Sequence, residues 1–136
     1  MTAFALDPRL AGDTHLVADF DLCRVLLMDD ARFPWLILVP RRIGLTEIIE
    51  LSRDDQHALL DEVDRAARTL HALYKPDKLN VAALGNLVAQ LHVHVIARFH
   101  RDAAWPRPVW GVGERAAYPD VERAQRLAAL RLALRA

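Results

Sequence analysis

The chain has 136 residues, which is enough for one domain and too few for two of ordinary size. Apolar residues make up 53% of it and charged residues 26%, a composition that predicts a folded domain with a hydrophobic core. The 18 basic and 18 acidic residues balance. This neutrality argues against a general nucleic-acid binder, because such a protein needs a basic surface. The single cysteine, Cys23, excludes an intrachain disulfide.

The chain carries no pattern typical of export or membrane insertion. Residues 1–10 contain Asp7 and Arg9 and lack the apolar run of a signal peptide. No apolar stretch reaches the ~18 residues that a membrane span needs. If the protein is bacterial, we therefore expect it in the cytoplasm, without a membrane partner.

The first part of the chain predicts a group of strands. Turns are expected at residues 7–8 and 12–13, followed by an edge strand at 15–19. Residues 23–28 (CRVLLM) form a clearer strand. Residues 35–39 (WLILV) form an unbroken apolar strand that we expect at the centre of a sheet, covered on both faces. The short connection between these two strands favours an antiparallel pair.

A long amphipathic helix and two further strands follow. The sequence SRDD from Ser52 resembles a capping box, and apolar residues then recur at helical spacing over residues 53–73. Residues 78–84 and 90–97 predict two strands, separated by a turn at 85–86.

The end of the chain completes the predicted architecture. Residues 105–113 (WPRPVWGVG) predict an ordered loop, and residues 119–134 predict a last helix. The sum is an α+β fold with a mainly antiparallel sheet, one long helix packed on it and a C-terminal helix. We expect one domain over residues 1–136, with its core at about 10–111 and the C-terminal loop and helix at 112–136.

The most informative segment is the strand predicted at residues 90–97. Side chains alternate across a strand. Gln90, His92 and His94 therefore share one face, which we expect to look outward as a flat shelf. The apolar residues between them face the core beneath the long helix.

This polar face allows three interpretations. A neutral imidazole is a competent nucleophile near pH 7, and neighbouring donors can stabilise the charge on phosphoryl oxygens. A His-x-His pair is also half of a metal site, but it needs a third ligand such as Asp29, Asp30 or His100. No spaced cluster supplies one in the sequence, so we expect no metal. The remaining interpretation is an exposed strand face without chemistry.

The string QLHVHVIAR at residues 90–98 resembles the signature of the histidine triad (HIT) family. The segments LMDD and WLILVPRR, at residues 27–30 and 35–42, resemble that family's strand pair. KLNVAALGN at 78–86 resembles the strand and turn before the triad. AWPRPVWG at 104–111 is similar to a segment of a bacterial subgroup of short HIT proteins. The resemblance spans roughly residues 10–111.

The resemblance implies the HIT α+β fold, a homodimer whose sheets join, and a nucleotide hydrolase or nucleotidyl transferase without a cofactor. His92 corresponds to the nucleophile, which attacks the α-phosphate and forms a nucleotidyl-histidine. Its other ring nitrogen is expected to bond to the backbone carbonyl of Gln90, and His94 to bind phosphate oxygens. The implied substrates are nucleoside phosphoramidates, dinucleoside polyphosphates or related nucleotidyl conjugates.

Two positions depart from the family pattern. Gln90 replaces the first histidine; it can orient a partner by hydrogen bonding but cannot act as an acid near neutral pH. Trp35 stands where many members have another histidine, and it would either stack on a base or fill the pocket. These changes also fit a nucleotide-binding protein with little or no turnover. Trp105 and Trp110 lie in a segment that family members often bring toward the nucleotide, and we expect at least one of them to pack on the sheet.

Four further residues are candidates for substrate binding. Asn80 and Asn86 fall near family positions that contact ribose or phosphate. Arg98 follows the triad strand, where it would meet a phosphate or form a surface ion pair. Asp29 would contact ribose hydroxyls, although turn formation explains it equally well.

Overall fold

The computed structural model describes residues 3–135, which fold into three α-helices, a short 3-10 helix and a five-stranded sheet. The strand order is β1-β2-β3-β5-β4, and every neighbouring pair is antiparallel. This confirms the predicted α+β class. The strands are β1 (Thr14–Asp19), β2 (Cys23–Met28), β3 (Trp35–Pro40), β4 (Lys78–Ala82) and β5 (Val93–Arg98).

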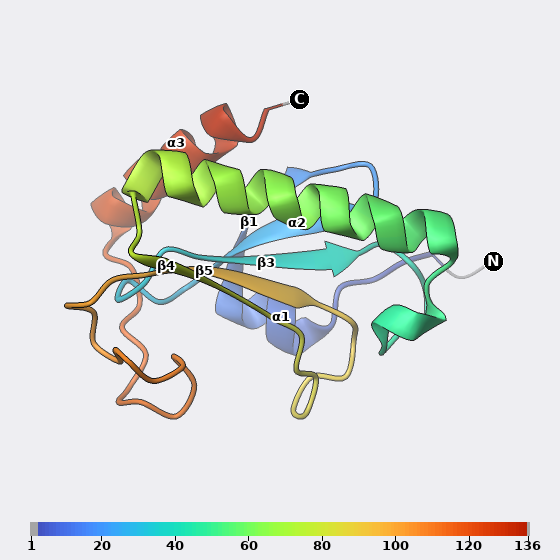
Figure 1. Ribbon diagram of the computed structural model, residues 1–136, viewed down its shortest axis with the longest axis horizontal. Helices are drawn as coiled ribbons and strands as arrows, with labels where there is room; N and C mark the ends of the chain where they lie inside the picture. Colours follow the sequence, from blue (N-terminus) through green and yellow to red (C-terminus); the bar gives the residue numbers. More distant parts are fainter. Residues whose placement is uncertain (1–2, 136) are drawn as a thin grey trace.

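The helices lie on both faces of the sheet (Figure 1). Helix α2 (Arg53–Tyr74) runs across one face, and the short helix α1 (Pro8–Asp13) lies on the other side of the sheet. Helix α3 (Asp120–Ala133) follows the C-terminal loop and contacts the end of α2, where the Arg126 guanidinium stacks on the Tyr74 ring. No helix within residues 3–135 is both long and apolar enough to cross a membrane.

The central strands β3 and β5 are buried along their whole length. Alternate residues of β3 enter two separate clusters of the core: Leu36 and Leu38 pack beneath α2, while Trp35 and Ile37 pack on the opposite face. The unbroken apolar sequence of β3 follows from this double coverage. The expectation of a central strand covered on both faces is confirmed.

Helix α2 begins and ends as its sequence predicts. The Ser52 hydroxyl accepts a hydrogen bond from the Asp55 backbone N–H at 3.1 Å, and Lys75 closes the helix in the left-handed conformation. Glu62, however, does not lie on the solvent side as its charge suggests. Its buried carboxylate accepts hydrogen bonds from the backbone N–H groups of Leu22 and Cys23, at 2.9 and 2.8 Å. Glu62 therefore ties α2 to the start of β2.

Two predicted boundaries are wrong. The turns expected at residues 7–8 and 12–13 are replaced by helix α1, because Pro8 suits a first helical position and the Asp7 carboxylate caps the Arg9 backbone N–H at 2.8 Å. The strand predicted at 90–97 begins only at Val93, and β4 ends at Ala82. Of the three triad positions, Gln90 and His92 therefore lie in the loop just before β5, and His94 lies within the strand.

Candidate functional site

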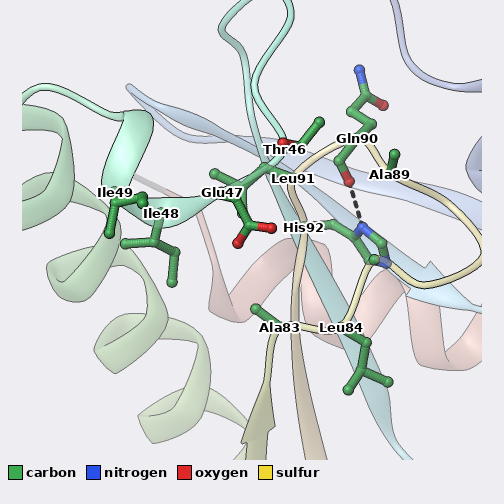
Figure 2. Close-up of a pocket in the computed structure, with 11 residues that line it drawn as sticks. Thr46, Glu47, Ile48, Ile49, Ala83, Leu84, Ala89, Gln90, Leu91 and His92 are labelled. Atoms are coloured by element: carbon green, nitrogen blue, oxygen red, sulfur yellow. Dashed lines mark hydrogen bonds between the residues drawn. The ribbon is translucent and has the colours of Figure 1, made fainter.

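His92 is held by the backbone just before β5. Its Nδ1 atom lies 2.6 Å from the Gln90 carbonyl oxygen (Figure 2). A carbonyl can only accept a hydrogen bond, so a neutral His92 carries its proton on Nδ1. The other ring nitrogen, Nε2, then keeps a free lone pair. The contact implied by the family resemblance is thus present, although Gln90 has replaced histidine, because only the main chain of residue 90 is needed.

His94 is fixed in the opposite tautomer by Trp35. Ile37 on β3 is paired with His94, so Trp35, two residues earlier, is its diagonal neighbour on the same face. The indole Nε1–H lies 3.0 Å from His94 Nδ1. Because an indole N–H can only donate, Nδ1 must accept, and the His94 proton resides on Nε2.

Burial keeps His94 uncharged. Removal from water, together with the smaller effect of the charge that His92 carries when protonated, lowers the pKa of His94 to about 3. The ring centroids of His92 and His94 are 4.9 Å apart and the rings meet edge to face. The site thus pairs an imidazole whose Nε2 has a lone pair with one whose Nε2 is a donor.

The polar face of the triad is covered, so the expectation of an exposed shelf is wrong. Trp110, from the C-terminal loop, packs edge-on against His94 with centroids 4.9 Å apart and against Trp35 at 5.8 Å. Trp35 itself is 3% exposed, which leaves no open ring face for a base to stack on. It fills the pocket and also binds His94. The loop folds back here because the apolar residues on this face need cover.

The Gln90 side chain is turned away from the His92 ring (Figure 2). Its Oε1 accepts from the Asp7 backbone N–H at 2.8 Å, and its Nε2 donates to the Ala5 carbonyl at 2.9 Å. The amide therefore anchors the N-terminal segment. The orienting role expected of this side chain is not supported by its position, and only the Gln90 carbonyl takes part in the site.

A cavity of about 260 Å³ opens beside His92 (Figure 2). Its lining comes from the segment before α2 and from the β4–β5 loop, which the sequence did not identify as parts of one site. None of the lining residues is Lys or Arg, and Glu47 is the only carboxylate among them. The lining residues are Thr46, Glu47, Ile48, Ile49, Ala83, Leu84, Gly85, Ala89, Gln90, Leu91 and His92.

Arg98 and Asn80 belong to a buried network that does not reach this cavity. The Arg98 guanidinium pairs with Asp102, with Nε 2.7 Å from Oδ2, and its Nη1 donates to Asn80 Oδ1 at 2.8 Å. Another Arg98 nitrogen binds the Arg107 carbonyl at 2.7 Å. The ion pair of Arg98 is buried and not on the surface as expected, because Trp105 and the loop after β5 enclose the guanidinium, whose hydrogen bonds are made within this network.

The remaining candidates also lie apart from the cavity or at its edge. The Asp29 carboxylate accepts from the Tyr118 backbone N–H at 2.9 Å and lies 3.3 Å from His15 Nε2. Its contacts are therefore structural. Asn86 is exposed in the β4–β5 loop, next to the lining residue Gly85.

The residues considered as third metal ligands have other contacts. Asp29 binds the Tyr118 backbone, Asp30 is ion-paired with Arg32 at 2.9 Å, and His100 is exposed beside Asp77. Among residues 3–135, no group of three or more His, Cys, Asp or Glu side chains is placed to hold a metal ion.

The HIT domain family matches residues 9–101 of the chain. Three solved histidine triad proteins are similar over nearly the full length of both chains. The protein from Bradyrhizobium japonicum is 50% identical, with a TM-score of 0.95 and coverage of 98% of this chain and 99% of that one. The proteins from Marinobacter aquaeolei (46%, TM-score 0.95, coverage 98% and 97%) and Sinorhizobium meliloti (44%, TM-score 0.93, coverage 96% and 97%) are also similar.

No protein of curated function matches the chain. The family match covers more than half of the sequence, and the solved relatives share its fold almost end to end. The chain belongs to the histidine triad (HIT) family.

Proposed function

We propose that this HIT protein is a nucleotide hydrolase or nucleotidyl transferase. It acts at the α-phosphate of a nucleoside phosphoramidate, a dinucleoside polyphosphate or a related nucleotidyl conjugate. The observation that carries the proposal is the 2.6 Å contact between His92 Nδ1 and the Gln90 carbonyl. This contact leaves the Nε2 lone pair free for attack and stabilises the positive charge that the ring gains when Nε2 is bonded.

The reaction has two steps. The His92 Nε2 lone pair attacks phosphorus, and the bond from phosphorus to the leaving group breaks, which gives a nucleotidyl-His92 intermediate. The His94 Nε2–H donates to a non-bridging oxygen as negative charge develops there. Water, or another acceptor, then attacks phosphorus and gives up its proton to solvent, and the electron pair of the P–N bond returns to His92 Nε2. No step requires a resident metal or cofactor.

The proposed form is a homodimer joined through β4. This strand is an edge of the sheet, and an open edge favours pairing with another strand. Val81 on β4 and Leu60 on α2 are exposed, and both line an apolar groove beside this edge. A second copy related by two-fold symmetry would cover the groove and extend the sheet.

A second candidate function is nucleotide binding without turnover. It is favoured by the loss of two family imidazoles, since Gln90 anchors the N-terminal segment and a tryptophan occupies position 35. Such a protein would bind a nucleotide but form neither a covalent intermediate nor a product.

Intact-protein mass spectrometry distinguishes the two candidates. The protein is mixed briefly with adenosine phosphoramidate or with diadenosine tetraphosphate, and AMP release is followed in parallel. We expect AMP release that His92→Ala abolishes and that His57→Ala, a change on the exposed side of α2, leaves intact. Full turnover by His92→Ala would refute the proposal. Binding detected by thermal shift, without AMP or adduct from these substrates or from the activated p-nitrophenyl ester of AMP, would establish the second candidate.

A further inference from the structure

The leaving group of the proposed reaction has no acid beside it. Cleavage of a bond to a basic leaving group, such as an alkylamine, needs a proton donor, commonly a histidine. The nearest imidazole other than the nucleophile is that of His94. Whether His94 supplies a proton decides which conjugates the site can cleave.

Trp35 prevents His94 from serving as that acid. A histidine acid must carry protons on both ring nitrogens. His94 Nδ1, however, accepts the indole N–H of Trp35 at 3.0 Å. A proton on Nδ1 would place two donors face to face between buried side chains and break this bond. The low pKa of His94, about 3, is consistent with this geometry.

The same bond stops a proton relay through His94. If His94 gave up its Nε2 proton, it would have to gain another at Nδ1, and a donor-only indole cannot supply one. His94 therefore donates a hydrogen bond from Nε2 but does not transfer the proton.

The other groups around His92 do not replace this acid. The Gln90 amide is bound to the N-terminal backbone, and the His92 Nδ1–H is held by the Gln90 carbonyl. Asp7 interacts with His92 from the N-terminal segment, but hydrogen bonds from Arg9 lower its pKa. Glu47 in the cavity wall is exposed to solvent and is not hydrogen-bonded to His92, whose ring contacts the Gln90 carbonyl.

We propose that the substrate is a nucleotidyl conjugate whose leaving group is weakly basic and carries an apolar body. Acidic phenolates and carboxylates meet this description, and alkylamines do not. The apolar body would lie against Ile48, Ala83 and Leu84 in the cavity. The absence of Lys and Arg from the lining residues disfavours a polyphosphate chain there. The inference rests on the proposed function and narrows it.

The chemistry balances without a protein acid. The His92 Nε2 lone pair forms the P–N bond, and the P–O bond breaks with its electron pair remaining on the leaving oxygen as a stable anion. His94 keeps its Nε2 proton. In the second step water forms a P–O bond, the P–N electron pair returns to Nε2, and the proton of water passes to solvent.

A series of leaving groups tests the inference on the intact protein. The substrates are AMP esters of p-nitrophenol and phenol and the AMP phosphoramidate of an alkylamine. A positioned general acid contributes ~10²–10⁴-fold to such reactions, so we expect kcat/KM for the phosphoramidate to be at least ~100-fold below that for the p-nitrophenyl ester. Equal kcat/KM values across the series would overturn the inference while leaving the proposed function intact. No AMP from any member would refute the proposed function itself.

Trp35 variants link this selectivity to the indole N–H. Trp35→His offers His94 a partner that can exchange a proton. We therefore expect the ratio of kcat/KM for the p-nitrophenyl ester to kcat/KM for the phosphoramidate to fall by at least ~10-fold, because part of the contribution of a general acid would be restored. Trp105→Phe removes an indole from the loop after β5 and should leave the ratio unchanged. An unchanged ratio in folded Trp35→His would refute the role of Trp35. If that variant fails to fold, the wild-type series still decides the leaving-group class.

Nitrogen-15 spectra of labelled histidine provide a readout that does not depend on activity. In the wild-type protein we expect His94 Nδ1 to remain unprotonated between about pH 5 and 8, the range in which an ordinary histidine titrates. In Trp35→Phe, His94 Nδ1 loses the indole N–H that donates to it, and the nitrogen-15 signal of His94 Nδ1 should shift with pH. A protonated Nδ1 in the wild-type protein would contradict the assignment.

Discussion

The ion pair between Arg98 and Asp102 should be a main determinant of stability. Their side chains are 2% and 3% exposed, and the Asp102 carboxylate also accepts backbone N–H groups of Phe99, Ala104 and Trp105. Removal of one partner from a buried pair costs ~3–5 kcal/mol, because the other charge stays buried without compensation. We therefore expect Asp102→Ala to lower the free energy of unfolding by about this amount, a large part of the ~5–15 kcal/mol typical of a domain.

The chain contains a matched control for this prediction. Arg68 and Asp64 form an ion pair with the same four-residue separation and nearly the same distance, 2.8 Å, but their side chains are 80% and 56% exposed. Solvent screens such a pair, so Asp64→Ala should have a much smaller effect. Urea unfolding followed by circular dichroism measures both. Equal losses in the two variants would refute the claim that burial makes the Arg98 pair stabilising.

Four further outcomes are expected. The pKa of Asp102 is lowered to about 2, because its hydrogen bonds to Arg98 and the backbone outweigh the opposing effect of burial. The stabilisation from the ionised carboxylate should therefore be complete above the unfolded pKa of ~3.9 and lost as the pH falls through about 2. Urea unfolding at a series of acid pH values measures this loss, which should be missing in Asp102→Asn. His94→Phe should reduce kcat for AMP release by ~10²–10³-fold by removing a transition-state donor, and an unchanged kcat would contradict that role. Glu62→Ala should cost ~1–3 kcal/mol of unfolding free energy, measured in urea, because it leaves two buried backbone N–H groups without an acceptor. Val81→Lys should give a monomer in analytical ultracentrifugation, and a dimer would exclude the β4 interface.

The elements best predicted from the sequence are those with strong local patterns. The unbroken apolar run of β3 indicated a strand covered on both faces, and the Ser52 cap with its helical spacing located the start of α2. The boundaries of β5 were less well predicted, because the alternation of polar and apolar residues begins before the chain pairs with β3. Helix α1 was missed because six residues are too few to show a period.

The contacts of the site depended on partners far away in the chain. Trp35 lies 59 residues from His94, and the Gln90 amide binds backbone groups 83 and 85 residues away. No spacing rule relates such positions. From the sequence, Trp35 and the Gln90 side chain were therefore candidates for substrate contacts. In the folded chain they form hydrogen bonds within the protein instead.

The sequence by itself determined the α+β class and the long capped helix, since these depend on local periodicity. Its resemblance to the HIT family implied the contact of His92 with the Gln90 carbonyl, a main-chain group that any residue supplies. Only the tertiary structure decided the tautomer of His94, the cover over the triad and the burial of the Arg98 network. The physical reason is that hydrogen-bond polarity and burial are set by the partners that packing brings together, and these lie on strands and loops distant in sequence.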